Sequence, residues 1–411
     1  MWFRSLLILS LLSGSTGTFA DPLSFNAALT LAERSSADIE AQTAGLEAAQ
    51  SASRAAGALP DPKLTFGVDN LPATGPDRWS ADRDFMTMRK IGVMQDFPSV
   101  SKRRAEAATA NAAVDEADAQ RRVHVFAVRT SAAIAWLNRY YIERRVALFD
   151  ALGRENTLFA AAVQAALAGG RGTPADVIGP KLEAADLADR LDVLRADELK
   201  AKAGLRRLVG TDGDDPLTGD PPELVIDADQ LRSHLHMHPE LALFGPMIAL
   251  ARAQAQEAQA AKRPDWGVEL SYARRAAAYS DMVSLQFTLS LPLFSANRQD
   301  PLINAKHLEQ RRLEAERANM LREHTAALEA ELADYAALTS QLARIQDTRL
   351  PLAQQKVAYQ LASYQGGKAD LAAVLVARRE LIDAQLMHLD LQNRRDAAAA
   401  TIYYSYVEPT P

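Results

Sequence analysis

Residues 283–292 of this 411-residue chain read Val283-Ser284-Leu285-Gln286-Phe287-Thr288-Leu289-Ser290-Leu291-Pro292. Apolar residues occupy every second position of the run, and small or polar residues occupy the positions between them. A period of two predicts a β-strand with one apolar and one polar face. The strand is expected to end at Pro292, which cannot donate a backbone hydrogen bond.

Three more segments are predicted to be strands. The apolar positions of two of them alternate in the same way: Trp266, Val268, Leu270 and Tyr272 in one, and Leu64, Phe66 and Val68 in the other. A fourth segment, about residues 85–97, alternates less cleanly and closes with Phe97-Pro98, as residues 283–291 close before Pro292. The loops at 70–84 and 274–281 are polar. We therefore predict two strand pairs.

The two strand pairs belong to a duplicated unit. Pro60-Asp61 precedes the first pair and Pro264-Asp265 the second, and Gly169-Gly170-Arg171 recurs as Gly366-Gly367-Lys368. All these offsets are roughly 200 residues, which indicates two copies of one structural repeat. We expect a signal peptide at 1–20, a first repeat at 21–210, a Pro/Gly/Asp-rich linker at 211–226, a second repeat at 227–406 and a tail at 407–411.

Each repeat is predicted to contain a helix, the strand pair, a very long helix, a glycine break and a returning helix. The opening helices are expected at about 24–56 and 228–261, the second with a start or kink at His238-Pro239 and near Pro246. The long helices are expected at 102–168 and 297–364, the latter interrupted by Pro301 and Pro351. At about 1.5 Å per residue, such helices span roughly 100 Å, which implies coiled-coil packing.

The alternation of the strands fits two environments. Strands of about ten residues with an apolar and a polar face are typical of transmembrane barrels, and also of half-buried soluble sheets. Four strands are too few to close a barrel, and lipid does not tolerate open sheet edges. If the strands span a membrane, several chains must pool them, and three chains give twelve. The lipid-facing side chains are then expected to be Phe66, Trp266, Leu270, Tyr272, Leu285, Phe287 and Leu289.

The N-terminus and the composition narrow the compartment and the class of protein. Arg4, a short apolar run at 6–12 and Thr18-Phe19-Ala20 predict a secretory signal peptide that is cleaved before Asp21. The sequence contains no cysteine, which excludes disulfides, thiol catalysis and a lipidated cysteine. The net charge of −6 argues against nucleic-acid binding. No later apolar run is long enough for a membrane helix, so a membrane span is expected to consist of strands.

The glycine breaks carry a family resemblance. Tyr364-Gln365-Gly366-Gly367, followed by Leu375, Ala377 and Leu381, resembles the glycine tip and returning helix of the TolC-type outer-membrane efflux factors. In the first repeat, Gly170 is followed by Asp176, Val177 and Ile178 at matching offsets. With the duplication and the proline-closed strand pairs, the resemblance covers the mature chain. The modest length and the lack of cysteine are most similar to the heavy-metal-cation branch.

This resemblance implies a mainly α fold with a small β part. Duplicated long-helix coiled-coil hairpins would form a periplasmic tunnel, and four strands per chain would enter a 12-stranded barrel of a homotrimer in the outer membrane of a Gram-negative bacterium. It also implies a periplasmic adaptor and an inner-membrane pump as partners, a passive exit duct as the function, metal cations as one class of cargo, and neither a cofactor nor enzymatic activity.

Two groups of residues are candidates for function on this basis. Gly170, Arg171, Gly367 and Lys368 are expected to form tips that contact the adaptor; the alternative is plain helix capping with solvated charges. Asp176 and Asp370 are expected near the tunnel mouth, where threefold-repeated carboxylates select cations; the alternative is a capping aspartate. Ala373 and Val376 occupy positions where family members carry acids, and Arg378 and Arg379 follow, which argues against a carboxylate gate.

Two further clusters are weaker candidates. His234, His236 and His238 are possible ligands of a transition metal, although a helix would spread them around its axis, and a surface helix start before Pro239 is the favoured interpretation. Met86, Met88 and Met94 share one strand parity, which the match between Pro98 and Pro292 assigns to the lumen side. They are candidates for a soft-metal path, with generic packing favoured.

Other classes of protein fit the sequence less well. The main alternative is a soluble periplasmic coiled-coil rod such as the adaptor itself, but an adaptor is expected to have one helical hairpin, several β-domains and a membrane anchor. An enzyme is the remote option, because the sequence has no phosphate loop, nucleophile elbow or zinc-protease helix.

Overall fold

The computed structural model describes residues 22–170 and 172–406. The expected signal peptide at 1–20, Arg171 and the tail at 407–411 lie outside the described residues. The chain divides into two compact units that each take residues from several parts of the sequence. Among the described residues, unit 1 draws on 22–35, 131–170, 172–224 and 337–400, and unit 2 on 36–130, 225–336 and 401–406.

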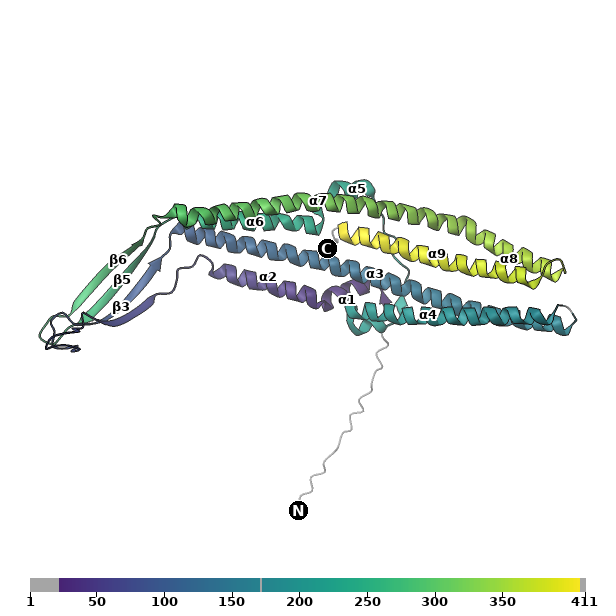
Figure 1. Cartoon of the computed structure of the whole chain (residues 1–411), viewed down its shortest axis with the longest axis horizontal. Helices are drawn as coiled ribbons and strands as arrows, with labels where there is room; N and C mark the ends of the chain where they lie inside the picture. The colour runs from purple at the N-terminus through teal and green to yellow at the C-terminus, as the bar shows by residue number, and fades with distance from the viewer. Residues whose placement is uncertain (1–21, 171, 407–411) are drawn as a thin grey trace, which may run out of the picture. The chain divides into compact units, whose positions relative to one another are not determined.

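The long helices dominate the chain. They are α3 (Val100–Ala168), α4 (Ile178–Val209), α7 (Gln299–Arg344), α8 (Leu350–Gln365) and α9 (Leu371–Tyr406) (Figure 1). Pro301 does not interrupt α7, because it lies in the first turn, where a missing N–H costs no helical hydrogen bond. Pro351 does mark a break: a π-helical turn at 345–349 separates α7 from α8. None of the helices in the described part of the chain combines the length and apolarity of a membrane span.

The two opening helices are both divided. The first consists of α1 (Phe25–Ser35) and α2 (Ala37–Ala55), separated at Ser36, whose hydroxyl accepts a hydrogen bond from the Ile39 N–H at 3.2 Å and caps α2. The sequence predicted a single helix there. The second consists of α5 (Ala228–His234), a 3-10 turn at 235–237 and α6 (Pro239–Ala260). The predicted start at His238-Pro239 is confirmed, and Pro246 lies inside α6.

Unit 2 contains the four predicted strands. They are β2 (Lys63–Asp69), β3 (Met88–Phe97), β5 (Asp265–Arg274) and β6 (Met282–Ser290), and they form one antiparallel sheet in the order β2-β3-β5-β6 (Figure 1). The strand β3 begins three residues later than predicted. The reason is local: the Asp84 carboxylate accepts a hydrogen bond from the Met86 N–H at 2.7 Å, which holds residues 84–86 in a turn.

Unit 1 contains a small parallel sheet that the sequence did not predict. It pairs β1 (Leu23–Ser24) with β4 (Leu217–Thr218), which lies within the expected linker. The indole N–H of Trp136 donates to the Leu23 carbonyl at 3.2 Å. The buried guanidinium of Arg139 donates to the carbonyls of Gly213 and Asp215 at 2.6 and 2.7 Å. These bonds fix the first part of the linker on α3.

Each unit has its own apolar core. In unit 1, Phe149 and Leu152 of α3 pack with Leu187 of α4 and Ile382 of α9. Two further clusters in unit 1 join α7 to α9 and α3 to α8 and α9. In unit 2, one cluster joins α5, α6, α7 and the end of α9; its buried members are Leu231, Leu235, Leu241, Leu328, Leu332 and Ile402. The clusters that contain α3 therefore join hairpin helices of the two repeats, and the cluster of α7 with α9 lies within the second repeat.

Candidate functional site

One face of the sheet in unit 2 is apolar and exposed. The strand register places paired residues on the same face, because directly opposed side chains in an antiparallel sheet point the same way. Phe66 pairs with Ile91, Ile91 with Tyr272, and Tyr272 with Val283. Phe66 is 82% exposed and Phe287 is 70% exposed. The exposed apolar residues of this face are Leu64, Phe66, Val68, Ile91, Val93, Trp266, Leu270, Tyr272, Val283, Leu285, Phe287 and Leu289.

The opposite face of the sheet is polar. Lys90 and Glu269 form an ion pair at 2.9 Å, and the Thr65 hydroxyl donates to Glu269 at 3.1 Å. Gly92 lies on the same face, and a Cβ atom there would come within 2.8 Å of the Ser271 Cβ. The seven expected lipid-facing residues thus lie together on the apolar face, and the polar residues cover the other.

The glycine breaks end helices of both repeats in unit 1. Gly170 and Gly367 adopt φ values of +75° and +70°, in the left-handed region that favours glycine. After α8, the Lys368 N–H donates to the Ser363 carbonyl at 2.8 Å and the Gly367 N–H to the Tyr364 carbonyl at 2.9 Å, which is a Schellman termination. Gly170, Gly367 and Lys368 are exposed. Each break therefore combines a helix stop with an accessible loop.

The two candidate aspartates of the tunnel mouth both bind backbone N–H groups. Asp370 accepts from the Ala373 N–H at 3.0 Å at the start of α9, and Asp176 accepts from the Thr173 N–H at 2.6 Å. These contacts give both side chains a capping role. Their role at a tunnel mouth stays a prediction.

A buried arginine near the tips was not singled out as functional from the sequence. Arg378 of α9 is 7% exposed, and its guanidinium contacts Glu155 of α3 at 2.9 Å and Glu183 of α4 at 3.2 Å. It also lies 4.6 Å from the centre of the Phe159 ring. Nearby, a Cβ on Gly179 would lie 2.4 Å from Leu375, so α4 and α9 approach closely here. Arg378 therefore joins the hairpin helices of one repeat to those of the other.

Comparison with known proteins finds a family match for the second repeat. Residues 233–405, nearly all of the second repeat, match the family described as outer membrane efflux protein. Over its second repeat the chain is therefore similar to the outer membrane efflux proteins. Its helices, strands and duplicated order have the fold that this resemblance implies.

Solved structures of similar fold cover almost all of this chain. CusC, studied for transmembrane channel formation, is 16% identical over 95% of this chain and 93% of its own, with a TM-score of 0.77. A membrane protein from Pseudomonas aeruginosa is 15% identical over 93% and 92%, with a TM-score of 0.79. The outer membrane protein VceC from Vibrio cholerae is 20% identical over 93% and 95%, with a TM-score of 0.73. No curated protein matches the sequence significantly.

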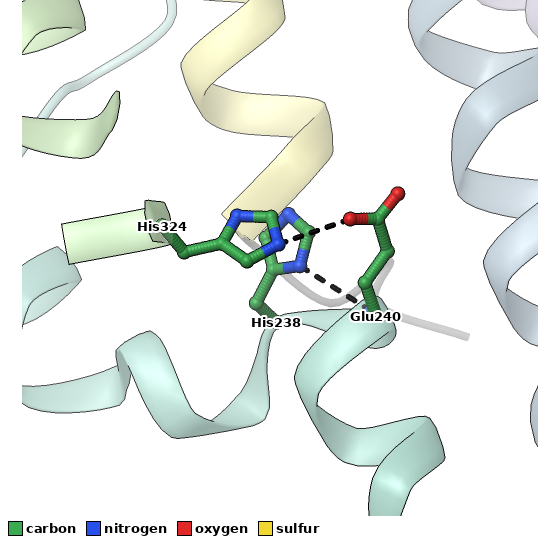
Figure 2. A group of neighbouring side chains, drawn as sticks. All are labelled: His238, Glu240 and His324. Carbon is green, nitrogen blue, oxygen red and sulfur yellow. Dashed lines mark hydrogen bonds and ion pairs between the residues drawn. The ribbon is translucent and has the colours of Figure 1, made fainter. Parts of the chain in front are cut away.

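The histidine candidates of this chain do not form one group. The His238 and His324 rings lie 4.1 Å apart, and His324 Nε2 contacts a Glu240 carboxylate oxygen at 3.0 Å (Figure 2). Among the described residues, these three side chains form a group whose possible ligand atoms lie within 4.8 Å of one another, and His234 and His236 are not part of it. Burial, aided by the neighbouring His324, lowers the pKa of His238 to about 4.

The methionine candidates lie in and beside β3. Met88 and Met94 occupy the polar face of the sheet, and Met86 precedes the strand. The shared strand parity of Met88 and Met94 is therefore confirmed, whereas the lumen side assigned to it stays a prediction. A metal path along them stays a prediction.

Proposed function

We propose that this efflux protein is the outer-membrane exit duct of a tripartite efflux system and carries substrate passively. The observation that carries the proposal is the sheet in unit 2, which exposes twelve large apolar side chains on one face and keeps its other face polar. A soluble surface rarely presents so large a contiguous apolar patch. Lipid outside and water inside suit these two faces.

The open edges of the sheet support a trimer. In the four-stranded order, β2 and β6 each have one unpaired edge. Unpaired backbone groups in lipid cost several kcal/mol each, about the cost of burying an unbonded polar group. Three chains would pair β6 of one with β2 of the next and close twelve strands. Phe66, Trp266 and Phe287 would face lipid, and Lys90 and Glu269 would face the lumen.

The helical hairpins of unit 1 would form part of the periplasmic tunnel. Gly170, Gly367 and Lys368 are exposed at the loops that end α3 and α8, which suits contact with a periplasmic adaptor. The adaptor would link the duct to an inner-membrane pump, which supplies the energy. The buried Arg378 would hold the hairpins together while the tunnel is closed, because it contacts α3 and α4 from α9.

The proposal extends to the class of substance that the duct carries. The resemblance to the heavy-metal-cation branch favours metal cations. Transport through such a duct needs neither a cofactor nor bond chemistry, so we propose that the chain is not an enzyme. To assign the cargo, a deletion strain and the same strain with the gene restored are grown on a panel of metal salts and organic toxicants.

Light scattering of the detergent-extracted mature chain tests the duct, with the mass corrected for bound detergent. A mass of three chains that is obtained only with detergent is expected. A monomer that dissolves in plain buffer would overturn the shared sheet and favour a soluble coiled-coil rod. For the tips, Lys368→Ala is expected to weaken resistance without lowering the amount of trimer, whereas unchanged resistance would remove Lys368 from the adaptor contact.

A further inference from the structure

A compact group of two histidines and one glutamate lies in unit 2, where α6 begins. His238 is the residue before α6, Glu240 is in its first turn, and His324 projects from α7 (Figure 2). One potential ligand atom from each side chain lies within 4.8 Å of the others. His238 is 8% exposed, and the His324 side chain is 14% exposed. Two of the three side chains are therefore largely withdrawn from solvent.

The donor set selects a class of ion. Two imidazole nitrogens and one carboxylate oxygen suit borderline divalent transition metals such as Zn²⁺, Co²⁺ or Ni²⁺. Calcium and magnesium prefer all-oxygen sites, and Cu(I) prefers sulfur. In a tetrahedral zinc site with bonds of about 2.0–2.2 Å, neighbouring ligand atoms lie about 3.3 Å apart. Side-chain movements of about 1 Å would bring these three atoms to that spacing.

The surroundings hold the imidazoles in place. The His238 Nδ1 accepts a hydrogen bond from the Glu240 N–H at 3.3 Å, and the Tyr406 ring lies 4.9 Å from the His238 ring. This cap bond is long, so exchanging it for a bond to metal, or switching the tautomer, costs little. Pro239 and Tyr406, which adjoin the cluster, also line a cavity of about 580 Å³.

We propose that His238, Glu240 and His324 bind one divalent transition-metal ion of the zinc class per chain. The ion fastens the first turn of α6 to α7. Without metal, His324 Nε2 and a Glu240 carboxylate oxygen are in direct contact at 3.0 Å, whereas a metal ion between them would bind both side chains at once. The proposal goes beyond the function as a duct.

Metal binding to the purified, chelator-treated protein in detergent tests the proposal. Cobalt(II) serves as the spectroscopic probe, because its visible absorption reports nitrogen and oxygen ligation, and competition with a zinc-binding dye gives the affinity. We expect one Zn²⁺ per chain. His324→Gln, Glu240→Gln and His238→Asn are each expected to weaken binding by at least about tenfold. Asn is chosen at 238 because it also caps a helix.

The controls separate this site from other histidines. His307→Gln, an exposed residue on the same helix α7, and His234→Gln are expected to leave binding unchanged. The Glu240 side chain is 51% exposed, so Glu240→Gln preserves the fold, and light scattering of each variant verifies the assembly. Absence of a bound equivalent, or binding that survives His324→Gln and is lost in His234→Gln, overturns the proposal. Because no transport is measured, a negative result leaves the proposed duct intact.

Discussion

The sheet of unit 2 and the hairpins of unit 1 differ in where their apolar side chains lie. In the sheet, apolar side chains such as Phe66 and Phe287 are exposed on one face, and the ion pair of Lys90 with Glu269 lies on the other face. In the hairpins, apolar residues such as Phe149 and Ile382 are buried between helices. The hairpins thus bury part of their apolar surface within the chain, although Leu158 and Leu182 stay exposed. The sheet is suited to an apolar surrounding that the chain does not supply.

This contrast predicts which changes each region tolerates. A charge introduced on the apolar face of the sheet is expected to impair membrane insertion and trimer assembly. A lost charge between the hairpins is expected to act on local stability, because its partner is left buried in the same chain.

The largest effect is expected from Leu285→Arg in β6. An arginine near the middle of a lipid-facing strand costs about 2–4 kcal/mol, and a trimer carries the change three times. The yield of detergent-extracted trimer, measured by light scattering and by its amount in outer-membrane fractions, is expected to collapse. Gln286→Arg, the next residue on the polar face, is the matched control and should assemble. Equal losses in both variants would contradict the assignment of faces.

A smaller, local effect is expected from Arg378→Met near the tips. The change leaves Glu183, whose side chain is 13% exposed, as a buried carboxylate without its charged partner. Breaking such a pair costs about 3 kcal/mol. Hydrogen exchange of residues 371–385 is expected to speed up, because the opening free energy of this segment falls.

The double variant Arg378→Met with Glu183→Met provides the control for this pair. Replacing both charges with apolar side chains of similar size is often neutral or stabilising, so protection of residues 371–385 should return. A double variant as unprotected as the single one would show that Arg378 acts through packing, for example on Phe159, and not through its charge.

The sequence predicted the regular parts of both regions for identifiable reasons. The strands at 283–291 and 266–272 can be recognised from the local sequence alone, because their apolar residues recur at every second position. The strand register confirms that these residues share one face. The proline-free stretch 102–168 predicted α3 to within two residues. The glycine breaks were found because left-handed backbone restricts the residue type.

The long-range contacts were not predictable in the same way. The partners of Arg378 lie on two other helices, roughly 200 residues away along the chain, and nothing in the local pattern marks them. The sequence grouped His238 with His234 and His236, but the side chain beside it is His324 of α7. The break at Ser36 was overlooked although serine is a common helix cap, because the alanine-rich pattern continues on both sides.

A still smaller effect is expected from Gly367→Ala at the second tip. A Cβ there meets no atom within 4 Å, so the cost is conformational: at φ +70° an alanine is disfavoured by about 1 kcal/mol. Gly153→Ala inside α3 is the matched control. It also meets no atom within 4 Å, but helical backbone favours alanine by about 0.5–1 kcal/mol. Opposite shifts in local hydrogen exchange are expected, and a stabilising Gly367→Ala would refute the need for left-handed backbone.

The smallest effect is expected from the exposed ion pair between the hairpins. Arg190 of α4 contacts Asp383 of α9 at 3.0 Å, but the two side chains are 36% and 49% exposed. Solvent and salt screen such a pair, so Arg190→Ala should cost less than about 1 kcal/mol. Hydrogen exchange around residue 383 at low and high salt measures it, and the small difference from wild type should vanish at high salt. An effect as large as that of Arg378→Met would mean that exposed charges hold the hairpins together, and burial would then not be what sets Arg378 apart.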